Sequence, residues 1–366
     1  MKNLMKPITL LLMVFISSAI FFGSCKKDST STPADQTALT KLMVSADSLS
    51  TAAIPANFPQ TDIDNYKATL ATVKAAAVLT TITQTQVDNL VVQLNAAMTL
   101  FKTKAYSYID ENLYLVAGWH FDEGTGTTAT SYSTAKQVGT FTKGWTTILG
   151  SAALLPTWVD GVKGGKAIYL DKGAHLEVPY TANLLPANIT ISAWIKNNLQ
   201  GWENNCIVSQ NFWWGYKFQT QSVGKPLFTE RINGTSVQDF DDGDATVTPG
   251  VWSHVVVSLN SSTKVLKFYI NGVLTHTYTA LDGVGALTQT LTYPDDNLTT
   301  GYTFTAQPFL IGSFATDAEL AAHPLTFSWI TAANVASFEG AIDELKIYNT
   351  ALSDGQVGKL YNDEKP

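Results

Sequence analysis

From Asn112 to about Asn362, apolar and polar residues alternate with a period of two, as in strands that bury one face. Asn271-Gly272 lies between two such runs and predicts a hairpin, because a type I′ turn needs positive φ at both residues. No strand–helix–strand rhythm is visible, so we expect a mainly β domain with two antiparallel sheets, a sandwich or jelly roll. The expected strands are 113–121, 167–170, 175–178, 189–196, 206–210, 215–220, 252–259, 265–270, 273–278, 309–312 and 340–348.

Residues 37–109 have a different period, in which apolar residues recur at i, i+3, i+4 and i+7 in three successive sets. Pro55 and Pro59 interrupt the first connection, and Thr83-x-x-Gln86 is typical of a capping box at the start of the third set. This segment therefore predicts a small N-terminal three-helix bundle.

Residues 1–24 have the pattern of a secretion signal, with Lys2 and Lys6 before an apolar stretch that ends at Phe22. The small residues before Cys25 resemble a bacterial lipobox, which implies cleavage before Cys25 and its lipidation. An ordinary signal peptide with a chance cysteine is the alternative. Residues 25–36 are polar and predict a flexible tether. We therefore expect a lipoprotein of the bacterial envelope, at the outer membrane, that contacts the membrane through its lipid alone; exposure at the cell surface is left open.

The charge composition argues against a nucleic-acid partner. Charged residues make up 14% of the chain, the net charge is −7, and Arg231 is the only arginine. A basic stripe that could contact phosphates is not visible. If Cys25 carries lipid, Cys206 is the only free cysteine, and its setting in "NNCIVSQ" predicts a small buried residue in a strand and not a nucleophile.

Two resemblances to known families add to these expectations. The segments "AGWHFDEGTGTTATSYS", "GVKGGKAIYLDKGAHLEVP", "NITISAWIKN", "TPGVWSHVVVSLNSSTKVLKFYINGVLTHTY", "PFLIGS" and "FEGAIDELKIYNTALSDGQVGKLY" occur in that order. The series resembles laminin-G-like domains of the concanavalin A-like jelly-roll family and covers residues 112–362. The resemblance implies one convex and one concave sheet, with ligands at the concave face or rim loops. "YKATLATVKAAAVLTTITQTQVDNLVVQLNAAMTLF" resembles the FIVAR-type helical repeats of bacterial surface proteins, which implies a spacer at residues 37–109.

Asp343 is an unusual residue in the last expected strand, because strict alternation would place it on the same face as Leu345 and Ile347. A buried carboxylate needs hydrogen bonds or a metal. The resemblance implies that the first expected strand pairs beside the last, which would bring Asp122 close to Asp343. The resemblance implies structural Ca²⁺ bound by Asp343, with Asp122 nearby, although "TATSYSTA" lacks an acidic residue that family members often carry. Amide hydrogen bonds to Asp343 are the alternative.

Glycan binding is the function that we favour, because sugars are recognised by aromatic faces and planar polar side chains. Packing beneath a long loop is the alternative role of each aromatic residue. Trp194 and Trp252 lie in runs that look buried on both faces, so we expect them in the core. The candidate glycan-binding residues are Trp202, Trp213, Trp214, Arg231, Asp239, Asp241, Tyr293, Tyr302 and Trp329.

An enzyme is less favoured. Jelly-roll glycosidases need two carboxylates at a fixed separation, which related glucanases place at alternate positions of one strand. No such run is found, and the acidic segment "DFDDGD" is glycine-broken and predicts a loop. The histidines lack zinc-site spacing. No catalytic residue is therefore predicted, and a structural or protein-binding adhesion module is the main alternative to glycan binding, which is favoured by analogy with anchored bacterial proteins of this family.

Overall fold

The computed structural model describes residues 33–366, apart from 56, 107–108, 199–202, 212–213, 233–235, 244, 289–291, 295–300, 304–305 and 334–336. The expected signal peptide, Cys25 and most of the expected tether lie outside the described residues. Within the described residues, no helix is long and apolar enough to span a membrane.

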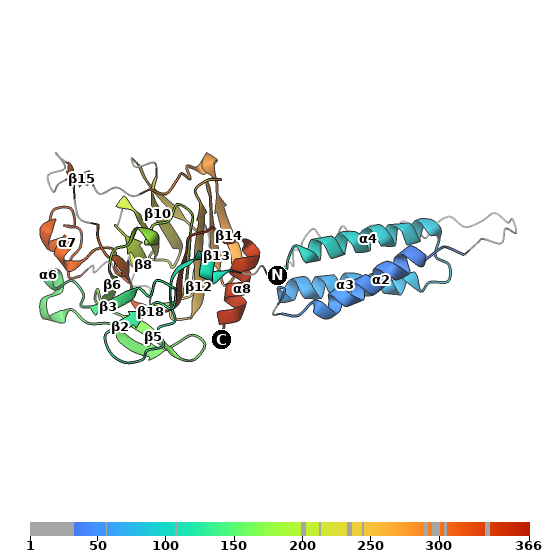
Figure 1. Cartoon of the computed structure of the whole chain (residues 1–366), viewed down its shortest axis with the longest axis horizontal. Coiled ribbons are helices and arrows are strands. Elements are labelled where there is room, and N and C mark those ends of the chain that lie inside the picture. Colours follow the sequence, from blue (N-terminus) through green and yellow to red (C-terminus); the bar gives the residue numbers. More distant parts are fainter. Residues whose placement is uncertain are drawn as a thin grey trace, which may run out of the picture.

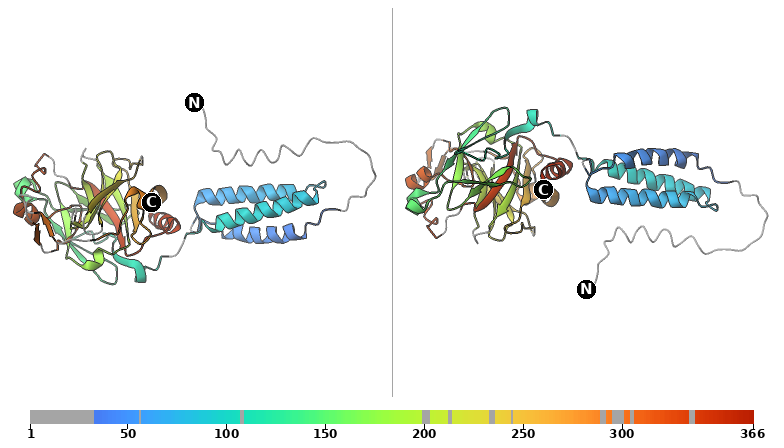
Figure 2. Two further views of the ribbon diagram at one scale, coloured as in Figure 1. Left: turned by 90° about the horizontal axis from the view of Figure 1, so that it is seen from above. Right: turned by 90° about the horizontal axis from the view of Figure 1, so that it is seen from below.

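Three helices, α2 (Thr37–Ala52), α3 (Gln60–Ala77) and α4 (Gln84–Lys102), form the N-terminal part of the described chain. They run side by side in Figure 2 and share an apolar core that includes Leu39, Tyr66 and Phe101. The Thr83 side chain accepts the Gln86 amide, and the Gln86 side chain accepts the Thr83 amide, so the capping box is present. The prediction of three helices is confirmed.

The first sheet has the strand order β14-β13-β12-β7-β18-β5-β4, with β1 also paired to β18 (Figure 1). In the β13–β14 turn, Asn271 and Gly272 have φ of 50° and 75°, so the predicted hairpin is confirmed. The strands are β1 (Leu115–Trp119), β4 (Thr157–Asp160), β5 (Lys166–Leu170), β7 (Ile189–Asn197), β12 (Ser253–Asn260), β13 (Val265–Ile270), β14 (Val273–Tyr278) and β18 (Gly340–Tyr348).

The second sheet has the order β11-β10-β9-β8-β17-β6-β3-β2, and β15 and β16 form a separate pair. Every pair of named strands in the described part of the chain is antiparallel. The strands are β2 (Thr128–Thr130), β3 (Val138–Thr142), β6 (His175–Val178), β8 (Asn205–Gln210), β9 (Tyr216–Thr220), β10 (Pro226–Ile232), β11 (Ser236–Asp241), β15 (Thr292–Pro294), β16 (Gly301–Thr303) and β17 (Phe309–Ile311).

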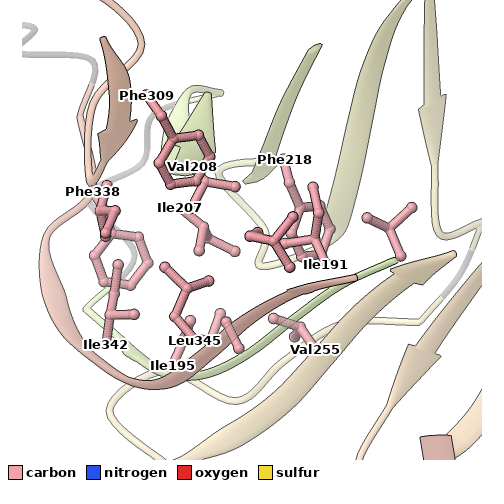
Figure 3. Close-up of a cluster of buried hydrophobic side chains, with 14 of the residues drawn as sticks. Ile191, Ile195, Ile207, Val208, Phe218, Val255, Phe309, Phe338, Ile342 and Leu345 are labelled. Carbon is pink, nitrogen blue, oxygen red and sulfur yellow. The ribbon is translucent and has the colours of Figure 1, made fainter. Parts of the chain in front are cut away.

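The main core lies between the two sheets, as Figure 3 shows. Ile191 and Val255 of the first sheet point toward Ile207 and Phe309 of the second. Aligned side chains that interdigitate between two antiparallel sheets define a sandwich. The predicted mainly β, two-sheet architecture is therefore confirmed.

Short helices cover the outer faces of both sheets. They are α5 (Glu111–Tyr114), α6 (Thr146–Leu149), α7 (Asp317–Ala322) and α8 (Asp354–Glu364). In Figure 1, α6 and α7 lie beside the second sheet, and α8 lies beside β12, β13 and β14 of the first. Val357 and Leu360 of α8 pack against Val256, Tyr269 and Tyr348 on the outer face of the first sheet.

The expectation that Trp252 lies in the core is wrong. Along β12, Val255 and Val257 face the core, whereas Val256 packs beneath α8. Trp252 has the same parity as Val256, so it lies on the outer face. Trp252 is half-buried, because α8 covers Val256 but does not enclose Trp252. Trp194 is buried as expected, but it also lies on this outer face, where its indole N–H donates to the carboxylate of Glu364 in α8.

Candidate functional site

A β-bulge in β18 places Asp343 on the face opposite to the one expected. Between Asp343 and Lys346, the pairing with β7 shifts by one residue, and Glu344 takes the left-handed φ of 46°. Leu345 and Ile347 therefore point into the core (Leu345 is labelled in Figure 3), whereas Asp343 points away from it. The prediction that Asp343 points inward with them is wrong, because an extra residue in a strand breaks its period of two.

Asp343 is buried and holds the segment between β4 and β5. Its Oδ2 accepts the Val162 amide at 2.8 Å, and its Oδ1 accepts the Glu344 amide at 2.9 Å. Asp122 holds the same segment, since its Oδ1 accepts the Lys166 amide at 2.7 Å. The structure thus brings Asp122 and Asp343 together as predicted, and amide hydrogen bonds satisfy part of each carboxylate.

The oxygens around this segment are of the type that Ca²⁺ binds. Three oxygens converge on the side of Gly161 where another residue would carry its Cβ. That position is 2.7 Å from Asp343 Oδ2, 2.7 Å from the Gly164 carbonyl oxygen and 2.8 Å from the Lys166 carbonyl oxygen. Carboxylates and backbone carbonyls are hard donors that suit this ion. Within the described residues, however, no three His, Cys, Asp or Glu side chains converge as a metal site. The oxygen types fit calcium, and the number of carboxylates is small.

On the second sheet, a row of mostly polar side chains crosses the face turned away from the core. The row follows the strand register from β11 to β3, while Phe218 and Phe228 of the same strands point into the core. Leu310 is its apolar member. In order, the row consists of Asp239, Thr229, Lys217, Ser209, Leu310, Glu177 and Thr140.

The row is buried at its centre and exposed at its ends. Lys217 is buried, and its ammonium donates to Asn204 Oδ1 at 3.1 Å and Gln219 Oε1 at 2.6 Å. Burial lowers the pKa of Lys217, because a charged amine is disfavoured away from water, while Asp239 partly offsets this. Asp239 is exposed on the edge strand and accepts the Thr229 hydroxyl. The row therefore offers an accessible carboxylate beside a rigid hydrogen-bonded centre.

Two candidate tryptophans lie in an apolar cluster beside this row. Trp214 and Trp329 are half-buried and pack against a cluster that contains Cys206 and Phe314. The Trp329 ring stacks on Phe314 with a centroid separation of 5.5 Å and an interplanar angle of 16°. Cys206 is buried as expected, and burial raises the pKa of its thiol to about 12. Each tryptophan therefore packs against this cluster and keeps an exposed portion.

The β10–β11 hairpin gathers the three polar candidates. Arg231, Asp239 and Asp241 occupy its two strands, and Asp241 Oδ1 accepts the Gly243 amide at 2.9 Å. The Arg231 amide donates to the Gly215 carbonyl at 2.8 Å. Trp214 directly precedes Gly215 in the chain, so its backbone lies close to this hairpin. The acidic segment "DFDDGD" was expected to be a loop. This expectation is wrong for its first three residues, 239–241, because they pair with β10 as the end of the edge strand β11.

The remaining candidates lie outside the described residues wholly or in part. Trp202 and Trp213 are outside them. Tyr293 and Tyr302 are opposite each other in the β15–β16 pair, but their side chains are outside the described part.

Sequence reasoning missed the buried centre of the row, Lys217 and Thr229. The signal was available in "YKFQT", where Lys217 alternates with the inward-facing Tyr216 and Phe218.

Comparison with known proteins identifies the class of the β domain. Residues 170–315 match the family described as the concanavalin A-like lectin/glucanases superfamily. This part of the sandwich is therefore similar to laminin-G-like, concanavalin A-like jelly-roll domains, as the sequence motifs indicated. The search of curated proteins found no match.

Solved structures with a similar fold include several binding domains. The binding domain of Paraclostridial Mosquitocidal Protein 1 has 15% identity and a TM-score of 0.44 over 69% of this chain and 53% of that one. Domain 4 of an extracellular arabinanase from Geobacillus stearothermophilus, in complex with arabinotriose, has 20% identity and a TM-score of 0.45 over 68% and 98%. A botulinum neurotoxin type C structure, described as depending on two ganglioside molecules for cell entry, has 14% identity and a TM-score of 0.44 over 70% and 53%. This chain thus spans about half the length of the two toxin chains.

Proposed function

We propose that the protein binds a polysaccharide or other glycan without catalysis, through the outer face of the second sheet at the β10–β11 hairpin. One observation carries the proposal: the register-aligned polar row ends at the exposed Asp239, beside Arg231 and close to the half-exposed Trp214. Binding sites for small ligands combine apolar or aromatic surface with a few placed polar groups, and this edge has both.

The side chains match the chemistry of a sugar. The Trp214 indole offers a flat apolar face for ring C–H groups. The planar guanidinium of Arg231 donates to hydroxyls, and the Asp239 carboxylate accepts from them. The Lys217 ammonium is fixed by hydrogen bonds to Asn204 and Gln219, and the Thr229 hydroxyl of β10 donates to Asp239 of β11. A ligand would therefore meet polar groups that are already in place, which lowers the ordering cost of binding.

The test is a panel of immobilised glycans, probed with calcium and with chelator. Wild type should bind at least one glycan, and Asp239→Asn and Arg231→Gln should each weaken binding about tenfold, since a hydrogen bond to a charged group contributes ~1.5–3 kcal/mol. Asp47→Asn, in the exposed Lys74–Asp47 ion pair of the helices, is the matched control and should bind normally. Binding that both site variants retain would place the ligand elsewhere.

Glycoside hydrolysis is the second candidate, on one observation. Asp239 and Asp241 lie on the same face of β11, at alternate positions of one strand. Paired carboxylates are what such enzymes use. If this function holds, the protein should release reducing sugar from a bound glycan, and Asp241→Asn should abolish release while retaining binding. Glycan binding without release of reducing sugar would contradict hydrolysis and support a non-catalytic binding module.

We also propose that the domain is held at the bacterial envelope by lipid on Cys25, with residues 25–36 as tether and residues 37–109 as spacer. The charged and apolar pattern before Cys25 supports this. Cys25→Ala should leave the protein uncleaved or soluble. A processed Cys25→Ala protein that stays with the membrane fraction would contradict it.

A structural calcium ion at Asp343 and Asp122 is a further part of the proposal, supported by the oxygen types that surround Gly161. Added Ca²⁺ should raise the melting temperature of wild type and not of Asp343→Asn, because a ligand stabilises the state that binds it. An equal response in both proteins would exclude Asp343 as a ligand.

A further inference from the structure

A second candidate binding site lies on the outer face of the first sheet, on the opposite side of the sandwich from the β10–β11 hairpin. An open pocket of about 330 Å³ is lined by Asp160, Tyr169, Lys196, Asn198, Trp252 and Ala341, among others. We propose that this pocket, termed here the outer pocket, binds a sugar residue that carries a carboxylate. The site is separate from the proposed glycan site and is tested separately.

The strand register builds the outer pocket. Tyr169 of β5 pairs with Ala341 of β18, and Ala341 pairs with Lys196 of β7. Because Ser253 pairs with Ile195, the preceding Trp252 lies next to Lys196. The small side chain of Ala341 therefore forms a low floor between the Tyr169 ring on one side and the Trp252 ring on the other.

The two aromatic side chains are accessible. Tyr169 and Trp252 are both half-buried, whereas the other tryptophan of this face, Trp194, is enclosed by α8. Apolar surface that is exposed and contiguous can mark a ligand-binding groove. Flat rings that flank a shallow floor can contact the apolar face of a sugar ring.

The polar groups of the outer pocket point to an acidic sugar. Asn198 Nδ2 donates to the Tyr169 hydroxyl at 3.2 Å, which leaves the hydroxyl proton to be donated to a ligand. The carboxylate of Asp160 is paired with Lys166 at 2.8 Å. Lys196 is exposed, and within the described residues no ion pair engages its ammonium. An anionic ligand group would therefore meet an available cation between two rings.

The size of the outer pocket limits the ligand. Its volume lies at the lower end of the range for small-molecule sites, about 300–1,000 Å³. One or two sugar residues fit this range, and a single cation matches a single carboxylate. The ligand class is therefore a uronic acid, at a chain end or within a short oligosaccharide.

The test is calorimetric titration of the protein, residues 25–366, with digalacturonate and with the neutral disaccharide of the same linkage. Wild type should bind the acidic sugar at least about tenfold more tightly, and salt should weaken this binding. Trp252→Ala should weaken binding of both sugars, and Lys196→Gln should remove the preference for the acid. Lys143→Gln, a surface lysine away from the outer pocket, is the matched control and should behave as wild type.

The outcomes separate this inference from the proposed function. Asp239→Asn and Arg231→Gln should leave digalacturonate binding unchanged, because they lie on the other sheet. Absence of saturable binding, equal affinity for the two sugars, or binding that survives both Trp252→Ala and Lys196→Gln would overturn the inference. Lys196→Gln changes an exposed side chain, so its melting temperature should match wild type and its result does not depend on refolding.

Discussion

At Asp343, one carboxylate accepts two backbone amides in a place where water is scarce. Asp343→Ala would leave both amides without an acceptor, and a buried polar group without a partner costs about 1–3 kcal/mol. We therefore expect the free energy of unfolding to fall by about that amount in urea denaturation. Asp343→Asn keeps one acceptor oxygen and should lose less. An unchanged midpoint for Asp343→Ala would contradict this role.

The charge of Asp343 should make stability depend on pH. Burial raises its pKa from the ordinary 3.8 to about 7, and the charges of Glu344 and Asp122 add to the effect. The folded state then holds the proton more tightly than the unfolded state, so the contribution of Asp343 to stability is full below the ordinary pKa and is lost as pH rises to the shifted value.

Unfolding should be measured across this pH range in chelator, for wild type and Asp343→Asn. The stability of wild type relative to the variant should decrease as the pH rises. If the difference in unfolding free energy between wild type and Asp343→Asn does not change with pH, Asp343 has the same pKa in the folded and unfolded states, which would contradict this prediction.

At the scale of elements, α8 is attached to the first sheet through a buried ion network. Lys346 is buried and lies 2.5 Å from Glu344 and 2.6 Å from Glu364 of α8. Burial alone would raise the pKa of Glu344, but the hydrogen bond from His120 and the charge of Lys346 outweigh it and lower the pKa to about 2. Glu344 is therefore ionised at neutral pH, whereas burial raises the pKa of Glu364.

Removing the shared cation should loosen α8. Lys346→Met leaves the buried Glu364 and the half-buried Glu344 without their common partner, and removing one partner of a buried pair costs about 3–5 kcal/mol. The control is Lys359→Met, because the exposed Lys359–Asp363 pair should contribute at most about 1 kcal/mol. Thermal unfolding of both variants is the measurement. Equal, small losses would mean that water enters the network and screens it.

The sequence predicted elements better than their faces. The capping box at Thr83 and the turn at Asn271-Gly272 depend on local chemistry, so they could be found from residue types alone. The pairing of β1 beside β18 followed from the family resemblance. The face of Asp343 could not be predicted, because the bulge at Glu344 depends on non-local pairing with β7.

The candidate site was predicted only in part for a similar reason. Arg231, Asp239 and Asp241 were identified from their types, but their common hairpin results from pairing with β10. Burial by distant segments decided the rest. Lys217 is enclosed by the segment that contains Asn204, and Trp252 is left accessible where the cover by α8 ends. Neither effect has a local signature in the chain.

At the scale of the whole molecule, the helices and the sandwich should fold independently. Their apolar cores share no residue among those described. The contacts that approach both parts involve Tyr106, whose amide donates to the Asn57 carbonyl and whose hydroxyl accepts from Asn362 of α8. Few contacts across a boundary indicate separate domains.

A chain that starts near Tyr108 should therefore be soluble and should melt cooperatively, with a melting temperature close to that of the sandwich in the full chain. Circular dichroism and calorimetry test this. If the shortened protein is insoluble while residues 25–366 are stable, the boundary or the independence is wrong.

The central claim is that the β10–β11 edge of the jelly roll binds glycans, and a titration of wild type, Arg231→Gln and Asp239→Asn against the best glycan of the panel tests it most directly. Both side chains lie on one hairpin and would contact the same ligand, so the account predicts a loss of about tenfold in each variant with unchanged melting temperatures. Wild-type affinity in both variants would contradict it.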